Sequence, residues 1–450
     1  MAVNYYGFTH ADLTPLVHPS EPVTSSALST KELEKLLEEN KAKQEQLAKE
    51  LEAERKARQH AEATAEMLKS AKARSQNTAN SLAWDENTTR RLLIDRQLAA
   101  AGWDVNNPEK VGIEVEIPHQ PTNSGIGYAD YVLWGDDGKP LAVVEAKRSR
   151  ENMQKGREQA RYYAEGLAKQ LNCPTPIVFY TNGYEICIWD TKQYNAYRQV
   201  FGFYSKNSLM FLHYQHQHKD KNLELLNPDK AIADRPYQIE AIKSVTHQFQ
   251  NQRRKALIVQ ATGTGKTRVS IALVALLLKA RWVKRVLFLC DRKELRRQAD
   301  DAFKKNLPSE PRCVVGDTNQ IDQSARIFVA TYPGMMNRFS QLDVGFFDLI
   351  IADESHRSIY NKYRDIFDYF DALQVGLTAT PVKFIARNTF DLFGCENGDP
   401  TFNFDLADAI AHQPRYLNPF RVKEFTTEFL REGLKYKDLN DEHGLSFFIE

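Results

Sequence analysis

The chain lacks the cysteine spacing on which structural zinc sites and disulfide frameworks depend. Its cysteines are scattered, and no two of them form a CxxC pair. This pattern argues against both kinds of site and is typical of a reducing compartment, so we expect a cytoplasmic protein. The five cysteines are Cys173, Cys187, Cys290, Cys313 and Cys395.

Long apolar runs are also absent. No stretch reaches the ~18 apolar residues that a membrane-spanning helix needs. The N-terminus has no basic segment followed by an apolar core, which argues against a signal peptide. The sequence therefore predicts a protein with no membrane partner.

An excess of either charge is missing as well. The 60 lysines and arginines stand against 59 aspartates and glutamates, for a net charge of +1. Any surface that binds nucleic acid must therefore be a local one. With 450 residues, 42% of them hydrophobic, the chain is long enough for two or three domains with sizeable cores.

Proline and glycine disappear from residues 31–72, after a Pro-, Ser- and Thr-rich stretch over residues 1–30. Ala, Glu, Lys, Gln and Leu dominate residues 31–72, and this composition predicts one long helix. Its apolar stripe is broken, and Asn40 lies in the seam. The helix fits either a solvated arm or a coiled coil that binds a partner.

A glycine-rich stretch, Gln-Ala-Thr-Gly-Thr-Gly-Lys-Thr, has an apolar run on either side. That order predicts a strand, a phosphate-binding loop and a helix, although Gln260 stands where the strict pattern has its first glycine. The glycines let successive N–H groups point at one anion, and the helix adds its positive dipole end. We expect ATP to bind Gly263, Thr264, Gly265, Lys266 and Thr267, with Lys266 at the β- and γ-phosphates and Thr267 at Mg²⁺.

A second apolar run, residues 349–352, ends in Asp-Glu-Ser-His. In parallel sheets, ligands lie at the carboxyl ends of the strands. Asp353 is therefore placed to hold Mg²⁺ through water, and Glu354 to orient and deprotonate the attacking water. The chain carries both parts of an expected ATP·Mg²⁺ site.

Two strand-like runs, residues 128–134 and 141–147, flank the turn sequence Gly-Asp-Asp-Gly-Lys-Pro and predict a hairpin. If Asp137 and Gly138 are the two turn residues, Asp130 lies opposite Glu145, and Lys147 shares the face of Glu145. The two acids can hold Mg²⁺, and the lysine can position the attacking water or offset charge. A surface hairpin with patterned charges is the alternative, and the largely apolar strands disfavour it.

Residues 150–171 form an expected helix that carries Gln159 and Tyr163 on one face, four residues apart. Its many basic residues fit either a surface that tracks phosphates or a solvated helix face. Residues 191–230 are polar and contain the cluster His213, His216 and His218. Because no acidic or cysteine partner completes the cluster, we expect a solvated linker and not a metal site.

The hairpin resembles the PD-(D/E)xK nuclease family, with Asp130, Glu145 and Lys147 in its three core positions and Ala replacing the proline at position 129. The resemblance implies that these three residues are catalytic. It also implies that Gln159 and Tyr163 form the QxxxY element of restriction-motor subunits. By resemblance, Glu86 is an accessory metal ligand.

The second half of the chain resembles superfamily 2 helicases. The resemblance implies that Gln238 contacts adenine, that His356 completes a DEAD/DEAH-type box, and that Thr378 and Thr380 form motif III, which links ATP state to DNA grip. Two further strand ends resemble motifs Ia and Ib, with ordinary solvated loops as the alternative. Their candidate DNA contacts are Arg292, Arg296, Arg297, Thr331 and Arg338.

In their order, these motifs resemble the R (restriction and motor) subunit of type I restriction enzymes. The resemblance implies ATP-dependent translocation of double-stranded DNA, coupled to Mg²⁺-dependent cleavage of unmodified DNA. It implies ATP and Mg²⁺ as cofactors, and methyltransferase (M) and specificity (S) subunits as partners. A stand-alone helicase–nuclease of repair or phage defence is one alternative, and a DNA-binding scaffold with an inactive nuclease is the other.

The expected fold class is α/β in three parts. An N-terminal extension with the long helix covers 1–80, and an endonuclease domain with a restriction-endonuclease-like mixed sheet and flanking helices covers 81–225. One RecA-like parallel-sheet lobe covers 226–450. A superfamily 2 motor needs two such lobes, and the 69 residues after Pro381 are too few for a second one. We therefore expect a piece of a longer subunit that binds ATP·Mg²⁺ but hydrolyses it poorly.

Overall fold

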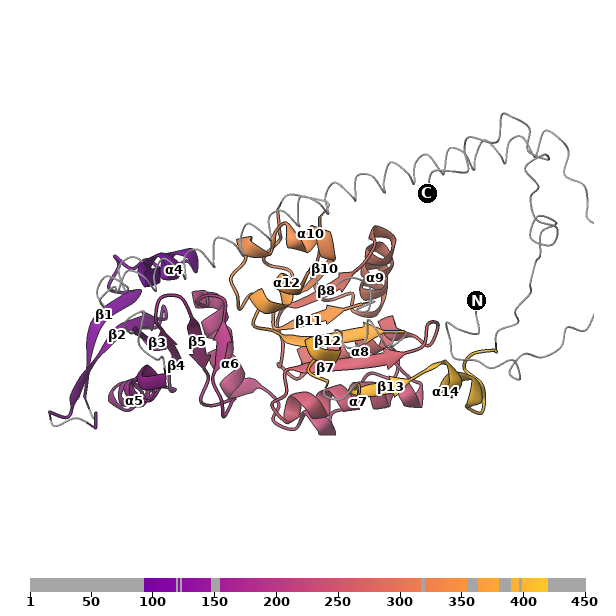
Figure 1. Cartoon of the computed structure of the whole chain (residues 1–450), viewed down its shortest axis with the longest axis horizontal. Helices are drawn as coiled ribbons and strands as arrows, with labels where there is room; N and C mark the ends of the chain where they lie inside the picture. The colour runs from indigo at the N-terminus through magenta and orange to yellow at the C-terminus, as the bar shows by residue number, and fades with distance from the viewer. Residues whose placement is uncertain are drawn as a thin grey trace, which may run out of the picture.

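Two β-sheets organise the chain, and they lie side by side along its long axis (Figure 1). The computed structural model describes residues 93–118, 120–121, 124–146, 154–316, 320–353, 363–379, 390–395 and 399–419. The first sheet has six strands in the order β1-β2-β3-β4-β5-β6, and the second has seven in the order β13-β7-β12-β11-β8-β10-β9. The long helix expected over 31–72 lies outside the described residues.

The first sheet is mixed, because β3 and β4 are parallel while its other neighbours are antiparallel. A parallel pair needs a crossover connection, and helix α5 (Gln154–Gln170) supplies it. Helix α5 packs on one face, while α4 (Asp95–Ala100) and α6 (Lys206–His218) share the core of the other face. The strands are β1 (Val111–Pro118), β2 (Ile126–Trp134), β3 (Pro140–Ala146), β4 (Ile177–Thr181), β5 (Ile186–Trp189) and β6 (Arg198–Val200).

The β2–β3 hairpin keeps the predicted register by a different turn. Tyr131 pairs with Val144, as predicted, but Trp134 pairs with Pro140 across a bulge. The turn is closed by the Gly135 N–H donating to the Lys139 carbonyl, with Gly138 at φ +70°. The predicted two-residue turn is therefore wrong. The loop between Gly135 and Lys139 holds three residues instead of two, which is a common hairpin length with a left-handed last position. The bulge at Leu133 and Trp134 compensates for the extra residue, so the predicted register is kept.

The prediction of a solvated linker over residues 191–230 is also wrong, because this stretch contains β6 and α6. Ser205 caps α6 by accepting from the Ser208 N–H, and Leu209 is fully buried in the core of the first sheet. His216 Nε2 lies 2.9 Å from both carboxylate oxygens of Asp190. The histidine therefore has an acidic partner, which the sequence did not reveal because Asp190 lies 26 residues earlier. Within the described ranges, no group of three or more His, Cys, Asp or Glu side chains is arranged to hold a metal.

The second sheet is parallel throughout, as expected for a RecA-like lobe. Helices α7 (Pro236–Gln250), α8 (Lys266–Lys279) and α9 (Lys293–Asn306) pack on one face, and α10 (Tyr332–Met336) and α12 (Arg364–Tyr369) on the other. Burial on both faces explains why its strands are almost continuously apolar. The strands are β7 (Lys255–Gln260), β8 (Val286–Cys290), β9 (Arg312–Val315), β10 (Ile327–Thr331), β11 (Leu349–Ala352), β12 (Leu373–Thr378) and β13 (Phe402–Phe404).

Short elements complete the described fold. Two 3-10 turns, η3 (Leu223–Leu225) and η4 (Phe339–Gln341), each bury an apolar side chain against the motor core. Helix α14 (Leu406–Ala411) follows β13 and begins with a capping box between Asp405 and Asp408. Among the described helices, none combines the length and the apolar character needed to cross a membrane.

Lys219, just after α6, has its charged ammonium in a largely desolvated position. Its ammonium lies 3.6 Å from the centre of the Trp282 ring and donates to Gln193 Oε1 at 2.9 Å. Burial lowers the pKa of Lys219 to about 8, from 10.5, although Asp190 acts in the opposite direction. The folded chain is therefore destabilised by this ammonium below pH 8, and the penalty fades as the pH rises towards 10.5.

We expect Lys219→Met to raise the free energy of unfolding by about 1–2 kcal/mol at neutral pH, a value discounted for solvent that reaches the side chain. The gain should shrink as the pH rises above 8, and urea unfolding at several pH values measures it. Lys221→Met, at an exposed lysine nearby, is the control. A gain that stays constant with pH would contradict the prediction.

Candidate nucleotide and nuclease sites

The loop between β7 and α8 has the backbone geometry of a phosphate-binding loop. Gly263 and Gly265 adopt φ +86° and +96°, a left-handed region that favours glycine. Gly265 is the N-cap of α8, a helix of 14 residues, so Lys266 begins the helix at its positive dipole end. The five loop residues expected to bind ATP are thus gathered in one turn at the carboxyl end of β7, next to the edge strand β13.

The carbonyl of Thr264 holds this turn in place. It accepts hydrogen bonds from Tyr237 Oη at 2.7 Å, from Gln238 Nε2 at 2.9 Å and from Gln260 Nε2 at 3.1 Å. Gln260, which departs from the strict motif, is fully buried and uses its side chain to fix the loop. The departure from glycine at this position therefore has a structural role.

Gln238 is tied to the loop and keeps one polar atom for another contact. Its amide nitrogen donates to Thr264, while its Oε1 is buried and has no hydrogen-bond partner among the described residues. A buried acceptor left in this state is costly, and the amino group of adenine is a donor of the right kind. The geometry fits the predicted contact between Gln238 and adenine.

Aromatic residues surround Gln238, and two of them, Phe404 and Tyr416, were missed by sequence reasoning. Tyr237 stacks on Phe404 of β13 with ring centres 4.1 Å apart, and Tyr416 meets Tyr237 edge-on at 4.8 Å. The guanidinium of Arg235 lies 5.3 Å from the centre of the Tyr416 ring and donates to Tyr237 Oη. No sequence signal joins Phe404 and Tyr416 to Gln238, because β13 pairs with β7 from more than 140 residues away.

Asp353 and Thr378 lie at the same edge of the sheet as the loop. Thr378 pairs with Val259 of β7 and is buried, and Asp353 directly follows β11, on the far side of β12. The Asp353 backbone is held by its own N–H to the Leu289 carbonyl and by Tyr332 Oη to its carbonyl. The predicted residues Glu354, His356 and Thr380 lie outside the described residues.

The predicted DNA contacts divide into two groups. Arg292 and Arg297 are exposed near the start of α9, while Thr331 caps α10 and Arg338 donates to the Gly334 carbonyl. Arg296 differs, because its side chain is buried and donates to the Val315 carbonyl at 3.0 Å. Arg296 ties α9 to β9 and is not presented to a ligand surface, so we leave it out of the proposed DNA contacts.

We expect Gly265→Ala to destabilise the chain by about 2 kcal/mol and to weaken ATP binding. The φ of +96° is unfavourable for alanine, and the new Cβ would lie 2.7 Å from Gln238 Nε2, displacing a donor from Thr264. Urea unfolding and titration with an ATP analogue measure the two effects. Gly263→Ala is the matched control, since its φ is similar but its Cβ would meet Leu417 at an ordinary 3.4 Å. Equal destabilisation in both variants would argue against the role of the Gln238 contact.

In the first sheet, Asp130 belongs to β2 and lies beside the carboxyl end of β3. Its Oδ2 accepts the Ala146 N–H at 2.7 Å, and continuing the observed register by one residue places Asp130 opposite Glu145. Opposed residues of an antiparallel pair project from the same face. Glu145 is 2% exposed, and a carboxylate buried next to another one favours a bound cation. Lys147 and Glu86 lie outside the described residues.

The QxxxY helix covers the face from which Glu145 projects. Val143, two residues before Glu145, packs with Tyr163 of α5 in one cluster. Gln159 Nε2 donates to Tyr163 Oη at 2.6 Å, and a Cβ at Gly127 of β2 would lie 2.5 Å from the Tyr163 ring. The two predicted support residues are therefore one hydrogen-bonded unit in close contact with the hairpin.

Two further residues near the candidate nuclease site gave no signal in the sequence. Gln120 Nε2 donates to the carbonyls of Pro118 and Tyr162, which joins the β1–β2 hairpin to α5. Glu114 has φ +51°. The pairing of its two neighbours in β1 places it beside Asp130, on the side of β2 that faces away from β3 and Glu145. Both depend on the pairing of β1, which the sequence pattern did not define.

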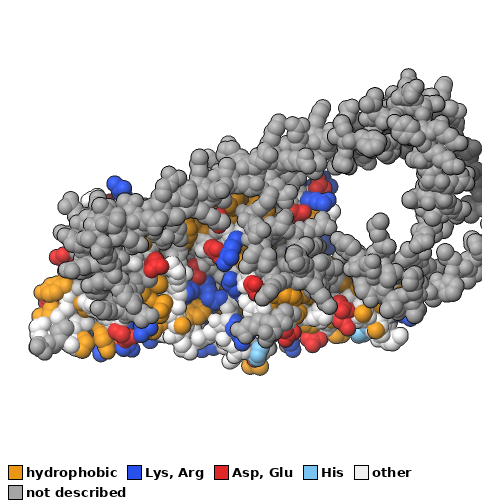
Figure 2. Space-filling view, in the orientation of Figure 1, with side chains coloured by type: hydrophobic (Ala, Val, Ile, Leu, Met, Phe, Trp, Pro, Cys, Tyr) orange, Lys and Arg blue, Asp and Glu red, His pale blue; other side chains and the backbone are white. Residues whose placement is uncertain are grey.

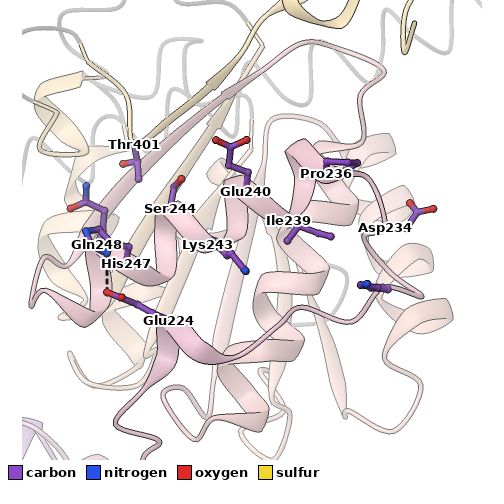
Figure 3. A pocket seen from close by; sticks show the side chains of 11 residues that line it. Glu224, Asp234, Pro236, Ile239, Glu240, Lys243, Ser244, His247, Gln248 and Thr401 are labelled. Atoms are coloured by element: carbon purple, nitrogen blue, oxygen red, sulfur yellow. Dashed lines mark hydrogen bonds and ion pairs between the residues drawn. The ribbon is translucent and has the colours of Figure 1, made fainter. Parts of the chain in front are cut away.

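A cavity of about 870 Å³ follows the outer side of α7 (Figure 3). Acidic and basic side chains alternate along it, and His247 pairs with Glu224 at 2.8 Å. None of the predicted ATP or nuclease residues lines it. The cavity has no group that would single out one ligand, and the candidate sites lie elsewhere.

Comparisons with known proteins match both halves of the chain. Residues 114–196 match the family described as type I restriction enzyme R protein N terminus, and residues 231–383 match type III restriction enzyme, res subunit. The first range includes the nuclease residues from Asp130 to Tyr163, and the second includes the motor residues from Gln238 to Thr380.

Two curated relatives point the same way. The type I restriction enzyme EcoAI endonuclease subunit of Escherichia coli is 30% identical over 76% of this chain and 44% of its own length. The EcoKI endonuclease subunit of E. coli K12 is 29% identical over 71% of this chain and 34% of its own length. A fragment structure of an HsdR subunit from Vibrio vulnificus YJ016 covers 73% of this chain and 61% of that one, at 28% identity and TM-score 0.35.

The chain spans less than half the length of these curated relatives. The matches to the R protein family and to both endonuclease subunits, with the motifs in the same chain, agree on one assignment. By these matches, the chain is similar to the N-terminal part of the R subunits of type I restriction enzymes.

Proposed function

We propose that this chain supplies the nuclease and the first motor lobe of an ATP-driven restriction enzyme, which moves along double-stranded DNA and cuts it where it is unmodified. The strongest support is that one chain has both an ordered glycine loop and a pair of opposed carboxylates. Hydrogen bonds to the Thr264 carbonyl hold the loop, and a hydrogen bond from the Ala146 N–H holds Asp130. The two sites lie in separate sheets of one chain, so that ATP use and DNA cleavage are separate chemical events.

In the motor sheet, the loop N–H groups and Lys266 would hold the phosphates of ATP, and Thr267 and Asp353 would hold Mg²⁺. The donor set fits, because it combines a helix N-terminus, a lysine and hard oxygen ligands. When bound, Mg²⁺ would neutralise charge on the transferred phosphoryl group. Glu354 would orient the attacking water and take its proton, Gln238 would contact adenine, and His356 would complete the acidic box. Thr378 and Thr380 would link the ATP state to the grip on DNA.

In the nuclease sheet, Asp130 and Glu145 would hold Mg²⁺, with Glu86 as an accessory ligand. The two acids fit this role because they are adjacent, and Glu145 is withdrawn from bulk water. When bound, Mg²⁺ would polarise the scissile phosphate. Lys147 would position the attacking water and offset the charge of the transition state. The unit formed by Gln159 and Tyr163 would keep α5 against the acidic face.

DNA would lie across the carboxyl edge of the motor sheet, along Arg292, Arg297, Thr331 and Arg338. Figure 2 shows Lys and Arg side chains also gathered between the two sheets on the face in view. These groups contact phosphates and carry no sequence information. We therefore expect methyltransferase and specificity subunits to choose the DNA site.

Nicking of a supercoiled plasmid by the purified chain tests the proposal. We expect nicking in Mg²⁺ and none in EDTA, and we expect the chain to co-purify with its methyltransferase subunit. Nicking without any methyltransferase partner in the cell would favour a stand-alone helicase–nuclease. DNA binding without nicking in any divalent cation would favour a scaffold with an inactive nuclease.

A further inference from the structure

A buried carboxylate joins the two sheets. Asp371 lies in the loop between α12 and β12 of the motor, and its side chain is 9% exposed. Arg198 of β6, the last strand of the nuclease sheet, donates to it through Nε at 2.8 and 2.7 Å. Nη2 of Arg198 lies 2.6 Å from Oδ2. The edge of one sheet is thus paired with the loop that begins a central strand of the other.

Three more groups complete this cluster. Arg254, directly before β7, donates through Nη2 to the carbonyl and Oδ1 of Asp371 at 3.0 and 2.8 Å. Tyr204 Oη donates to Oδ2 of the same carboxylate. The Tyr194 ring lies against both guanidiniums, 4.9 and 5.2 Å from their carbons. Burial alone would raise the pKa of Asp371, but Arg198 and Arg254 hold it well below its usual range.

Packing around the cluster extends the contact. The Tyr204 ring lies against Gly345 of the motor, where a Cβ would meet the ring at 2.6 Å. Ser205 N–H donates to Asp343 at 3.0 Å, and Val344 of the motor is buried in the nuclease core. The interface is therefore apolar at one side and held by charge-assisted hydrogen bonds at the other.

The ion cluster and the proposed ATP site lie at opposite ends of the same two strands, β7 and β12. Arg254 and Asp371 precede β7 and β12, which pair from Lys255 with Gln374 to Val259 with Thr378. The far ends of these two strands carry the phosphate loop and Thr378. The nuclease sheet is therefore attached to the opposite ends of the strands that contact the nucleotide.

We propose that Asp371 is a positioning residue that couples the nuclease domain to the motor lobe, so that nucleotide binding at the loop stabilises both domains together. The coupling rests on the function proposed above, since it gives the ATP site a physical route to the nuclease. It runs through two rigid strands and one buried ion cluster, and it makes the two sheets a single cooperative unit.

Calorimetry with and without Mg·ADP, which is not hydrolysed, tests the coupling. In the parent chain we expect one unfolding transition that moves to higher temperature as a whole when Mg·ADP binds. In Asp371→Asn, two guanidiniums lose their counter-charge, so we expect two transitions, of which Mg·ADP moves only one. Trypsin cleavage between residues 219 and 235 should become about 100-fold faster, as expected for loss of one partner from a buried ion pair.

Two other variants keep the test decisive. Asp368→Asn, the same change at an exposed residue of α12 that pairs with Arg364 at the surface, should behave as the parent. Gly345→Ala should split the transition through its contact with Tyr204, without replacing a charged residue. One transition that moves as a whole in both Asp371→Asn and Gly345→Ala would overturn the proposal. If Mg·ADP shifts nothing in the parent chain, the ATP site is refuted, and the number of transitions still decides the coupling.

Discussion

Replacing Asp130 with asparagine is expected to abolish Mg²⁺-dependent nicking of plasmid DNA. The change removes one of two carboxylates from the proposed metal site, and we expect at least about a 100-fold fall in nicking rate. The side-chain carbonyl of asparagine can still accept the Ala146 N–H, so the hairpin should keep its structure. The rate of conversion of supercoiled to open-circular plasmid, at a fixed Mg²⁺ concentration, measures the loss.

Asp137→Asn is the control for this prediction. Asp137 lies at the tip of the same hairpin, is 59% exposed and pairs with Lys139 at the surface. It should nick DNA at the parental rate, and both variants should unfold at similar urea concentrations. If Asp130→Asn cuts as fast as the parent chain, the opposed carboxylates are not the catalytic pair.

Replacing Lys266 with alanine is expected to weaken ATP·Mg²⁺ binding by between about 10-fold and 100-fold. The lysine begins α8 with its Nζ 3.4 Å from the Gln260 carbonyl, at the mouth of the loop. A charge-assisted hydrogen bond to phosphate contributes roughly 1.5–3 kcal/mol, which corresponds to that range. Titration of the chain with a fluorescent ATP analogue gives the dissociation constant directly.

Lys279→Ala provides the comparison, because Lys279 is an exposed lysine at the other end of the same helix. Both variants lose one charge from α8, so a general electrostatic effect would appear in each. Only Lys266→Ala should lose affinity. Equal affinities in the two variants would refute the assignment of the loop as the phosphate site.

The order of elements and the chemistry of the motifs followed from the sequence because both depend on local signals. The Gly263 and Gly265 loop stands between two long apolar runs, and the strand before Asp353 is continuous. Such runs specify buried parallel strands, and polar residues directly after them fall at the carboxyl edge. The predicted pairing of the β2 and β3 strands was correct for the same reason, since apolar positions on both strands fix the register.

What the sequence could not provide were contacts between distant segments. Asp190 and His216 form a pair from β5 and α6, and nothing in the chain links them before it folds. The same holds for Tyr416 beside Tyr237 and for Arg198 beside Asp371. Segment 206–218 also hid its helix, because its buried face depends on Leu209 and on the Ser205 cap instead of on a regular apolar stripe.

The Thr264 carbonyl, with its three donors, has a consequence for how quickly and how tightly a nucleotide can bind. A flexible glycine loop would lose conformational entropy on closing around a phosphate, and that loss would subtract from affinity. Here Tyr237, Gln238 and Gln260 have already ordered the loop during folding. Association should therefore proceed without a slow rearrangement step, and the favourable contacts with phosphate should appear almost in full as affinity.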